Sequence, residues 1–280
     1  VRQWEDHLPR IAAMGFDWVY LNPFHYPGFS GSLYAVKDYY RIHDRMWDGE
    51  HSLEDLLKSF CWKAGEHGLG VIMDLVINHT SKDSLLAEQH PEWFMHEADG
   101  SLRSPRAVDP DDPGKVTVWG DLAEIDYHRR AHRAGLVSYY GQLIGHFLDC
   151  GIRGFRCDAA YLVPAGIWSQ LISFARFKRN DATFFAETLG CRLDQIAALH
   201  SAGFDYLFNS AKWWDFRSPW LLEQYNSFRY IAPSVAFPES HDTERVAADL
   251  EREGLHDPVL IERAYRMRYM FTAVFSTGVM

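Results

Sequence analysis

Hydrophobic and polar positions along this chain follow two alternating patterns, one helical and one extended. The clearest helical stripe begins after Ser52, which can cap a helix; its members are Leu53, Leu56, Leu57, Phe60, Cys61 and Ala64. The clearest extended pattern is 71–77, an apolar run interrupted by one acid. A strand that is apolar on both faces is typical of a parallel sheet covered by helices.

The same alternation continues along most of the chain. We expect helices over 3–14, 52–64, 136–147, 165–178, 192–200, 211–229 and 257–269. We expect strands over 17–23, 71–77, 151–158, 183–187, 204–208 and 235–238, and a seventh within 271–280. The stretch 31–40, rich in Gly, Ser and Tyr, is predicted to be a loop. Helix-length gaps between seven strands predict repeated βαβ units.

Residues 80–130 interrupt this regularity. They are acidic, show little periodicity and contain four prolines: Pro91, Pro105, Pro110 and Pro113. We interpret them as an irregular subdomain inserted after the third strand, which leaves 1–79 and 131–280 as the main α/β domain.

An acid lies at or just past the end of four predicted strands; these acids are Asp74, Asp158, Glu187 and Asp242. Four polar ends that meet at one point indicate a closed (β/α)8 barrel, in which chemistry occupies the carboxyl-terminal face. The alternative, an open doubly wound sheet, usually carries a Gly-rich phosphate turn, and no Gly-x-Gly-x-x-Gly occurs. We therefore predict an α/β fold of the (β/α)8 type, incomplete at its ends.

Arg156 lies two residues before Asp158 and so on the same face of the strand. A buried carboxylate is costly unless it is paired or used. This stretch alone fits a structural ion pair as well as it fits catalysis.

Composition narrows the function classes. The chain has 280 residues, 47% of them hydrophobic, and a net charge of −10, which argues against nucleic acid and anionic membranes as partners. Aromatic residues make up 15%, which suggests ring-lined recognition surfaces. Four scattered cysteines do not form a disulfide framework or a zinc motif. The chain starts without Met, so we expect a piece of a longer protein; no signal peptide is seen, and we expect a cytoplasmic location.

Four separated stretches resemble, in order, the signature regions of the α-amylase superfamily of retaining α-glucan enzymes. They are 74–79 (Asp-Leu-Val-Ile-Asn-His), 154–158 (Gly-Phe-Arg-Cys-Asp), 185–187 (Phe-Ala-Glu) and 239–242 (Glu-Ser-His-Asp). The stretches 32–39 and 91–94 resemble, more loosely, the branch of maltose-1-phosphate maltosyltransferases. The resemblance implies a TIM barrel with a subdomain after its third strand.

The resemblance also implies roles for single residues. Asp158 would be the nucleophile, Glu187 the general acid/base, and Asp242 the group that binds sugar hydroxyls and stabilises the transition state. Retention of configuration needs two such carboxyls about 5–5.5 Å apart. The adjacent Arg156 would keep Asp158 ionised, and the surroundings of Glu187 should raise its pKa.

Further residues would bind substrate or support the site. The substrate-binding residues would be Tyr34, His79, Arg156 and His241, and Asp74 would serve as structural support for Arg156. Asn78 resembles a calcium ligand of many relatives. Calcium needs six or more oxygens, and beside Asn78 only Asp121 is a candidate, so we expect no cofactor and keep calcium as the alternative.

The predicted function is a hydrolase or transglycosylase that acts on α-1,4-linked glucose oligomers through a covalent glycosyl-enzyme. Many amylases carry Lys-His three and four residues past the nucleophile, where this chain has Tyr161 and Leu162, so its acceptor subsites should differ. Three alternatives stay open: a maltosyltransferase using maltose-1-phosphate, a catalytically silent barrel that binds glucan, and a metal-dependent hydrolase, for which no His-x-His pair is present.

Overall fold

The structure is a computed structural model that describes residues 1–108, 112 and 114–280. Pro110 and Pro113, two of the four prolines noted in 80–130, lie outside the described residues.

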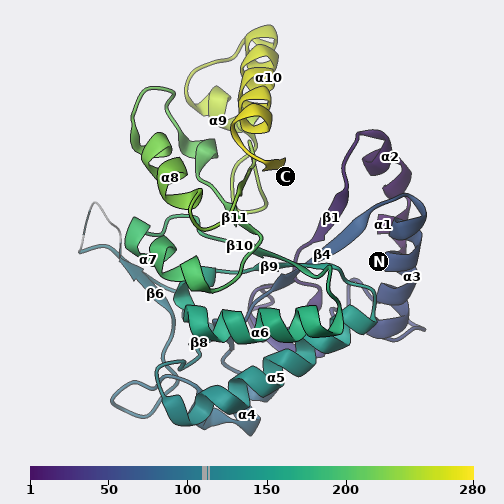
Figure 1. Ribbon diagram of the computed structural model, residues 1–280, viewed down its shortest axis with the longest axis vertical. Coiled ribbons are helices and arrows are strands. Elements are labelled where there is room, and N and C mark those ends of the chain that lie inside the picture. The colour runs from purple at the N-terminus through teal and green to yellow at the C-terminus, as the bar shows by residue number, and fades with distance from the viewer. Residues whose placement is uncertain (109–111, 113) are drawn as a thin grey trace.

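A seven-stranded parallel sheet forms the centre of the molecule (Figure 1). Its strands are β1 (Trp18–Leu21), β4 (Gly70–Leu75), β9 (Gly154–Cys157), β10 (Thr183–Ala186), β11 (Tyr206–Phe208), β12 (Ser234–Ala236) and β13 (Gly278–Val279). The spatial order repeats the chain order, with β1 and β13 at the two edges. A doubly wound sheet would reverse its order at a switch point. The sheet is therefore an incomplete (β/α)8 barrel, and the seven predicted parallel strands are confirmed.

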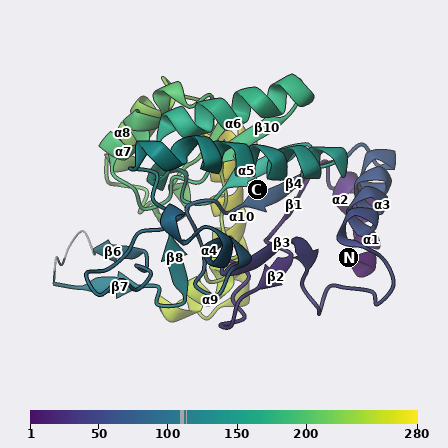
Figure 2. The same cartoon turned by 90° about the horizontal axis from the view of Figure 1, so that it is seen from below.

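The helices precede β1 or lie between successive strands of the sheet, and they cover its outer face (Figures 1 and 2). They are α1 (Arg2–Glu5), α2 (Leu8–Ala13), α3 (Leu53–Glu66), α5 (Arg130–Asp149), α6 (Ala165–Lys178), α7 (Leu193–Ala198), α8 (Trp220–Phe228), α9 (Val246–Arg252) and α10 (Pro258–Phe275). The Ser52 side chain caps α3 as predicted, accepting a hydrogen bond from the Asp55 amide at 3.1 Å. Within the part of the chain that is described, the helices are too short or too polar to cross a membrane.

Two helix predictions differ from the structure, and one helix was missed. The helix predicted over 3–14 is two helices, because Pro9 lacks the amide hydrogen that a continuous helix needs and lies instead in the first turn of α2. The helix predicted over 211–229 starts only at Trp220, after Phe216 adopts a left-handed φ of 59°. The short helix α9 was not predicted at all.

The core lies between the sheet and the surrounding helices. Helices α5 and α6 lie side by side on the sheet (Figure 2), and Trp168 and Phe147 bury their rings there completely. Phe155 and Phe184, on neighbouring strands, stack with ring centroids 5.1 Å apart. This packing holds the carboxyl ends of β9 and β10 in place.

Short antiparallel strand pairs lie outside the seven-stranded sheet. The predicted loop 31–40 is wrong in its second half, because β3 (Val36–Ile42) pairs with β2 (His25–Pro27) and buries Val36. The segment between β4 and α5 contains α4 (Leu85–Gln89), the 3₁₀ turn η1 (Pro91–Trp93) and two strand pairs: β5 (His79–Ser81) with β8 (Leu122–Glu124), and β6 (Arg106–Val108) with β7 (Val116–Val118).

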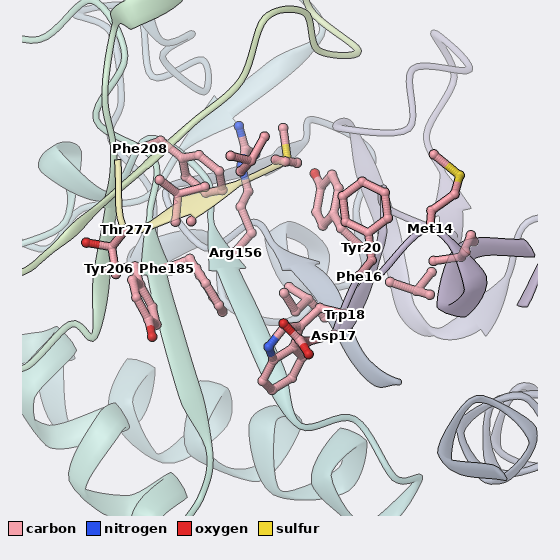
Figure 3. Close-up of a pocket in the computed structure, with 18 of the residues that line it drawn as sticks. Met14, Phe16, Asp17, Trp18, Tyr20, Arg156, Phe185, Tyr206, Phe208 and Thr277 are labelled. Carbon is pink, nitrogen blue, oxygen red and sulfur yellow. The ribbon is translucent and has the colours of Figure 1, made fainter. Parts of the chain in front are cut away.

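The inner face of the sheet is lined by apolar and aromatic side chains, which are Ile72, Phe185, Phe208, Val235 and Phe237. A cavity of about 750 Å³ lies inside the sheet between β1 and β13 (Figure 3). Trp18, Tyr20 and Arg156 reach into it from β1 and β9, and Arg156 connects it to the site described next.

Candidate active site

The three acids predicted to be catalytic come together at the carboxyl-terminal face of the sheet. Asp158 follows β9 and Glu187 follows β10, and the preceding residues Cys157 and Ala186 are partners in the register. Neighbouring strands are about 4.8 Å apart, so the two acids leave adjacent backbones at the same level. Asp242, from the loop after β12, shares a cleft of about 880 Å³ with Asp158 and a hollow of about 10 Å³ with Glu187.

Arg156 binds two carboxylates with one nitrogen. Its Nη1 donates to Asp158 Oδ1 at 2.7 Å and lies 3.0 Å from both oxygens of Asp74. All three residues sit at the ends of the neighbouring strands β4 and β9, and Asp74 is fully buried. Asp74 therefore pairs with Arg156 and competes with Asp158 for the guanidinium.

The pKa of Asp158 is raised, although Arg156 alone would lower it. Burial raises the pKa of Asp158 above its ordinary value, and the Arg156 charge opposes this without cancelling it. The nearby negative charge of Asp74 adds to the upward shift. Arg156 thus aims and partly stabilises the Asp158 carboxylate, but burial outweighs it.

Glu187 is held by two backbone amides. The amide of Ala159 donates to Oε2 at 2.7 Å, and the amide of Leu189 donates to Oε1 at 2.8 Å. Burial raises the pKa of Glu187 to about 7, with Arg156 and the two amides opposing the shift and Asp158 adding to it. The predicted rise in the pKa of Glu187 is confirmed, so a large fraction is protonated at neutral pH.

Tyr34, His241 and Asp242 form a chain of contacts that ends at the cleft. The Tyr34 hydroxyl donates to Asp74 Oδ2 at 2.7 Å and lies 2.6 Å from His241 Nε2, with the two rings parallel. His241 Nε2 also lies 3.0 Å from Asp242 Oδ2. This hydrogen bond from His241 lowers the pKa of Asp242 and favours its ionised form.

His79 and Asn78 lie at the wall of the same cleft. Burial lowers the pKa of His79 to about 4, so its ring is neutral, and Nε2 donates to the Tyr34 carbonyl oxygen at 3.2 Å. His79 therefore fixes the Tyr34 backbone and presents an uncharged ring edge to the cleft.

The Asn78 side-chain oxygen is buried and has no hydrogen-bond partner. Asp121 lines the same cleft, but these two side chains carry only three oxygens between them, fewer than the six or more that calcium takes. Nowhere in the described residues do three His, Cys, Asp or Glu side chains gather to hold a metal ion. The absence of a calcium ion from the working protein stays a prediction.

Two contributors to the site were not predicted from the sequence. Tyr20 on β1 donates its hydroxyl hydrogen to Asp74 Oδ2 at 2.6 Å. Ala159 adopts a left-handed φ of 39° directly after Asp158. The strand period of two places Tyr20 on the inner face with Trp18, a signal that could have been used; nothing in the sequence marks the Ala159 backbone.

The fold and these side chains define a (β/α)-barrel protein with three carboxylates at its carboxyl-terminal face. The family of the glucanotransferase domain of glycogen debranching enzyme matches residues 1–100. An α-1,4-glucan:maltose-1-phosphate maltosyltransferase of Burkholderia pseudomallei is 29% identical over 279 residues, 98% of this chain and 23% of that protein. A protein of the same name from Streptomyces coelicolor is 29% identical over 74% of this chain and 31% of its own length. The chain thus spans less than a third of these relatives.

Solved structures give the same result for the fold. An α-amylase from Lactobacillus plantarum superimposes with a TM-score of 0.68 at 27% identity, over 88% of this chain and 60% of the other. A maltogenic α-amylase from Thermotoga neapolitana gives 0.69 at 27% identity, over 90% and 58%. The chain is thus similar in fold to α-amylases and in sequence to maltose-1-phosphate maltosyltransferases, in line with the predicted resemblance to the α-amylase superfamily.

Proposed function

We propose that this chain carries the catalytic barrel of a retaining enzyme that acts on α-1,4-linked glucose oligomers through a covalent glycosyl-enzyme. The observation that carries this proposal is the pairing of Asp158 and Glu187 on adjacent strands, one beside a guanidinium and the other with a pKa raised to about 7. A retaining mechanism needs one carboxylate and one carboxylic acid about 5–5.5 Å apart. The names of the similar relatives and structures support the substrate class.

In the first step, an oxygen of the ionised Asp158 attacks the anomeric carbon, and the bond from that carbon to the glycosidic oxygen breaks. Glu187 gives its proton to the departing oxygen. Asp242, ionised beside His241, binds sugar hydroxyls and stabilises the positive charge that develops on the ring.

In the second step, Glu187 takes a proton from water or from a sugar hydroxyl, whose oxygen then attacks the same anomeric carbon and releases Asp158. Tyr34 stacks on the sugar that occupies this position, and His79 and His241 bind its hydroxyls. Barrel residues 1–79 and 131–280 supply the acids, and we propose that 80–130 acts as an inserted subdomain that walls one side of the cleft, because Trp119 and Arg106 line it.

The test compares Asp158→Ala and Glu187→Gln with the parent chain on maltooligosaccharides. Each variant should lose turnover by at least about a thousandfold, because each removes one of two groups that act as a unit. Asp181→Asn is the matched control, since Asp181 is an exposed acid before the start of β10 and pairs only with surface arginines. Turnover that survives in either active-site variant would refute the assignment.

A maltosyltransferase is the second candidate, favoured by the relatives' names and by Tyr161 and Leu162 at the cleft wall. Tyr161 places an aromatic ring near Glu187, where the acceptor must bind, and Leu162 adds an apolar side chain to the lining of the cleft. Incubation with maltose-1-phosphate plus maltooligosaccharide, against maltooligosaccharide alone, separates the candidates. If longer glucans form only with the phosphorylated donor, the transferase stands; if only shorter products form, the hydrolase stands.

Two further outcomes address the remaining alternatives. Glucan binding without turnover in the parent chain would favour a silent binding barrel. Loss of activity in chelator, restored by a divalent metal, would favour a metal-dependent hydrolase.

A further inference from the structure

Asp74 is a fully buried carboxylate that receives its stabilisation from three side chains. Tyr20 and Tyr34 donate to Oδ2 at 2.6 and 2.7 Å, and Arg156 Nη1 lies 3.0 Å from both oxygens. With no exposed surface, Asp74 receives no hydration from bulk water. A buried charge that loses a hydrogen bond draws more strongly on the donors that remain.

One of those donors is shared. The same Arg156 nitrogen that contacts Asp74 also donates to Asp158 Oδ1 at 2.7 Å. The better Asp74 is satisfied by tyrosine hydroxyls, the more of the Arg156 charge is available to Asp158. Burial and the nearby Asp74 charge raise the pKa of Tyr20, so its hydroxyl stays protonated and remains a donor.

Tyr20 differs from Tyr34 in its position. Tyr34 lines the cleft with Asp158 and Asp242, whereas Tyr20 borders the interior cavity (Figure 3) and the hollow of about 10 Å³ beside Glu187. That hollow has room for at most one water molecule. Tyr20 is therefore placed to act on the reaction through Asp74 and not by contact with a sugar.

We propose that Tyr20 is a positioning residue: its hydrogen bond to Asp74 leaves the Arg156 guanidinium free to hold the Asp158 carboxylate in its attacking position. This inference rests on the proposed function. The titratable and charged groups that interact with Asp158 come from several neighbouring elements. They are Arg156, Cys157, Asp74, Glu187, Tyr161, Asp242 and Tyr39. Of these, Asp74 and Arg156 are the two that also interact with Tyr20.

The test is Tyr20→Phe, which removes only the hydroxyl group. We expect kcat to fall about tenfold with KM within about twofold, because the lost bond goes to a charged group that does not touch substrate. The acidic limb of the kcat/KM profile, which reports ionisation of Asp158, should move up by about half a pH unit. Tyr127→Phe is the matched control, because its buried hydroxyl donates to the Ile77 carbonyl at 2.7 Å and contacts no charge; its profile should equal that of the parent.

A second measurement guards against misfolding of Tyr20→Phe. Replacement of Tyr20 by 3-fluorotyrosine keeps the ring and makes the hydroxyl a stronger donor, so the acidic limb should move down. An unchanged limb in both variants, with the parent active and Glu187→Gln inactive, would overturn the role of Tyr20 and leave the proposed function standing. If the parent itself shows no glucan turnover, the proposed function fails and the Tyr20 inference fails with it.

Discussion

The backbone amide of Ala159 donates a hydrogen bond to Glu187 Oε2 at 2.7 Å, linking the residue after the proposed nucleophile to the proposed acid/base. Ala159 itself adopts a left-handed φ of 39°, a conformation that residues with a Cβ rarely adopt. A strained backbone residue thus lies directly after the proposed nucleophile and is hydrogen-bonded to the proposed acid/base.

This geometry predicts opposite results for two substitutions at Ala159. Ala159→Gly should keep turnover and leave the free energy of unfolding within about 1 kcal/mol of the parent, because glycine adopts this φ without strain. Ala159→Val should lose about 1–3 kcal/mol, because a β-branched residue strongly disfavours it. Urea unfolding and glucan assays measure both effects. Equal stability of the two variants would contradict the prediction.

The pH dependence of kcat/KM should be bell-shaped and narrow. Glu187 must be protonated to give its proton, and its pKa of about 7 means that the rate falls as the pH rises through about 7. Asp158 must be ionised to attack. Because its pKa is raised, the rate should begin to fall on acidification at a pH above the ordinary pKa range of aspartate. The measurement is kcat/KM on maltooligosaccharide across neutral pH.

A matched control for the alkaline limb is Glu187→Gln with an aryl maltoside whose leaving group needs no proton. The residual rate of that variant should not fall above pH 7, since the titrating acid is gone. A parent profile that stays flat well into the alkaline range would argue against Glu187 as the acid.

Removal of Arg156 should destabilise the fold strongly. Arg156→Met leaves Asp74 and Asp158 buried without their cation, and breaking such a pair costs about 3–5 kcal/mol of unfolding free energy. Arg153→Met, three residues earlier, breaks an exposed pair with Asp181 and a cation–π contact with Trp18 at 5.6 Å, and should cost at most about 2 kcal/mol. The urea-unfolding midpoints of the two variants make the comparison, and similar losses would contradict it.

Packing inside the barrel gives a further prediction at Gly154 on β9. A Cβ there would lie 2.7 Å from Ile72 Cγ1, so Gly154→Ala should cost about 1–3 kcal/mol of unfolding free energy. Gly166→Ala in α6 meets nothing within 4 Å and should stabilise by about 0.5–1 kcal/mol, because alanine is the better helix former. Thermal melts of both variants would show whether the signs are opposite.

The sequence by itself determined most of the elements and their order. The apolar strand around Asp74 and the stripe after Ser52 are local patterns, set by burial over neighbouring positions, so they could be recognised without a structure. The four acids at strand ends could be predicted to meet because parallel strands present their carboxyl ends at one edge of a sheet. Local misses, such as the break at Pro9 and the β2–β3 hairpin, came from turn chemistry and pairing partners that periodicity does not encode.

Only the tertiary structure decided how the charge of Arg156 is divided. The sequence placed Arg156 beside Asp158 and predicted a lowered pKa, whereas Asp74, 82 positions away, takes part of the guanidinium and burial raises the pKa. Tyr20 reaches Asp74 across 54 positions, and no local pattern contains such a contact. Electrostatic balance depends on distance through space and on exclusion of water, and both exist only once the strands have closed around the site.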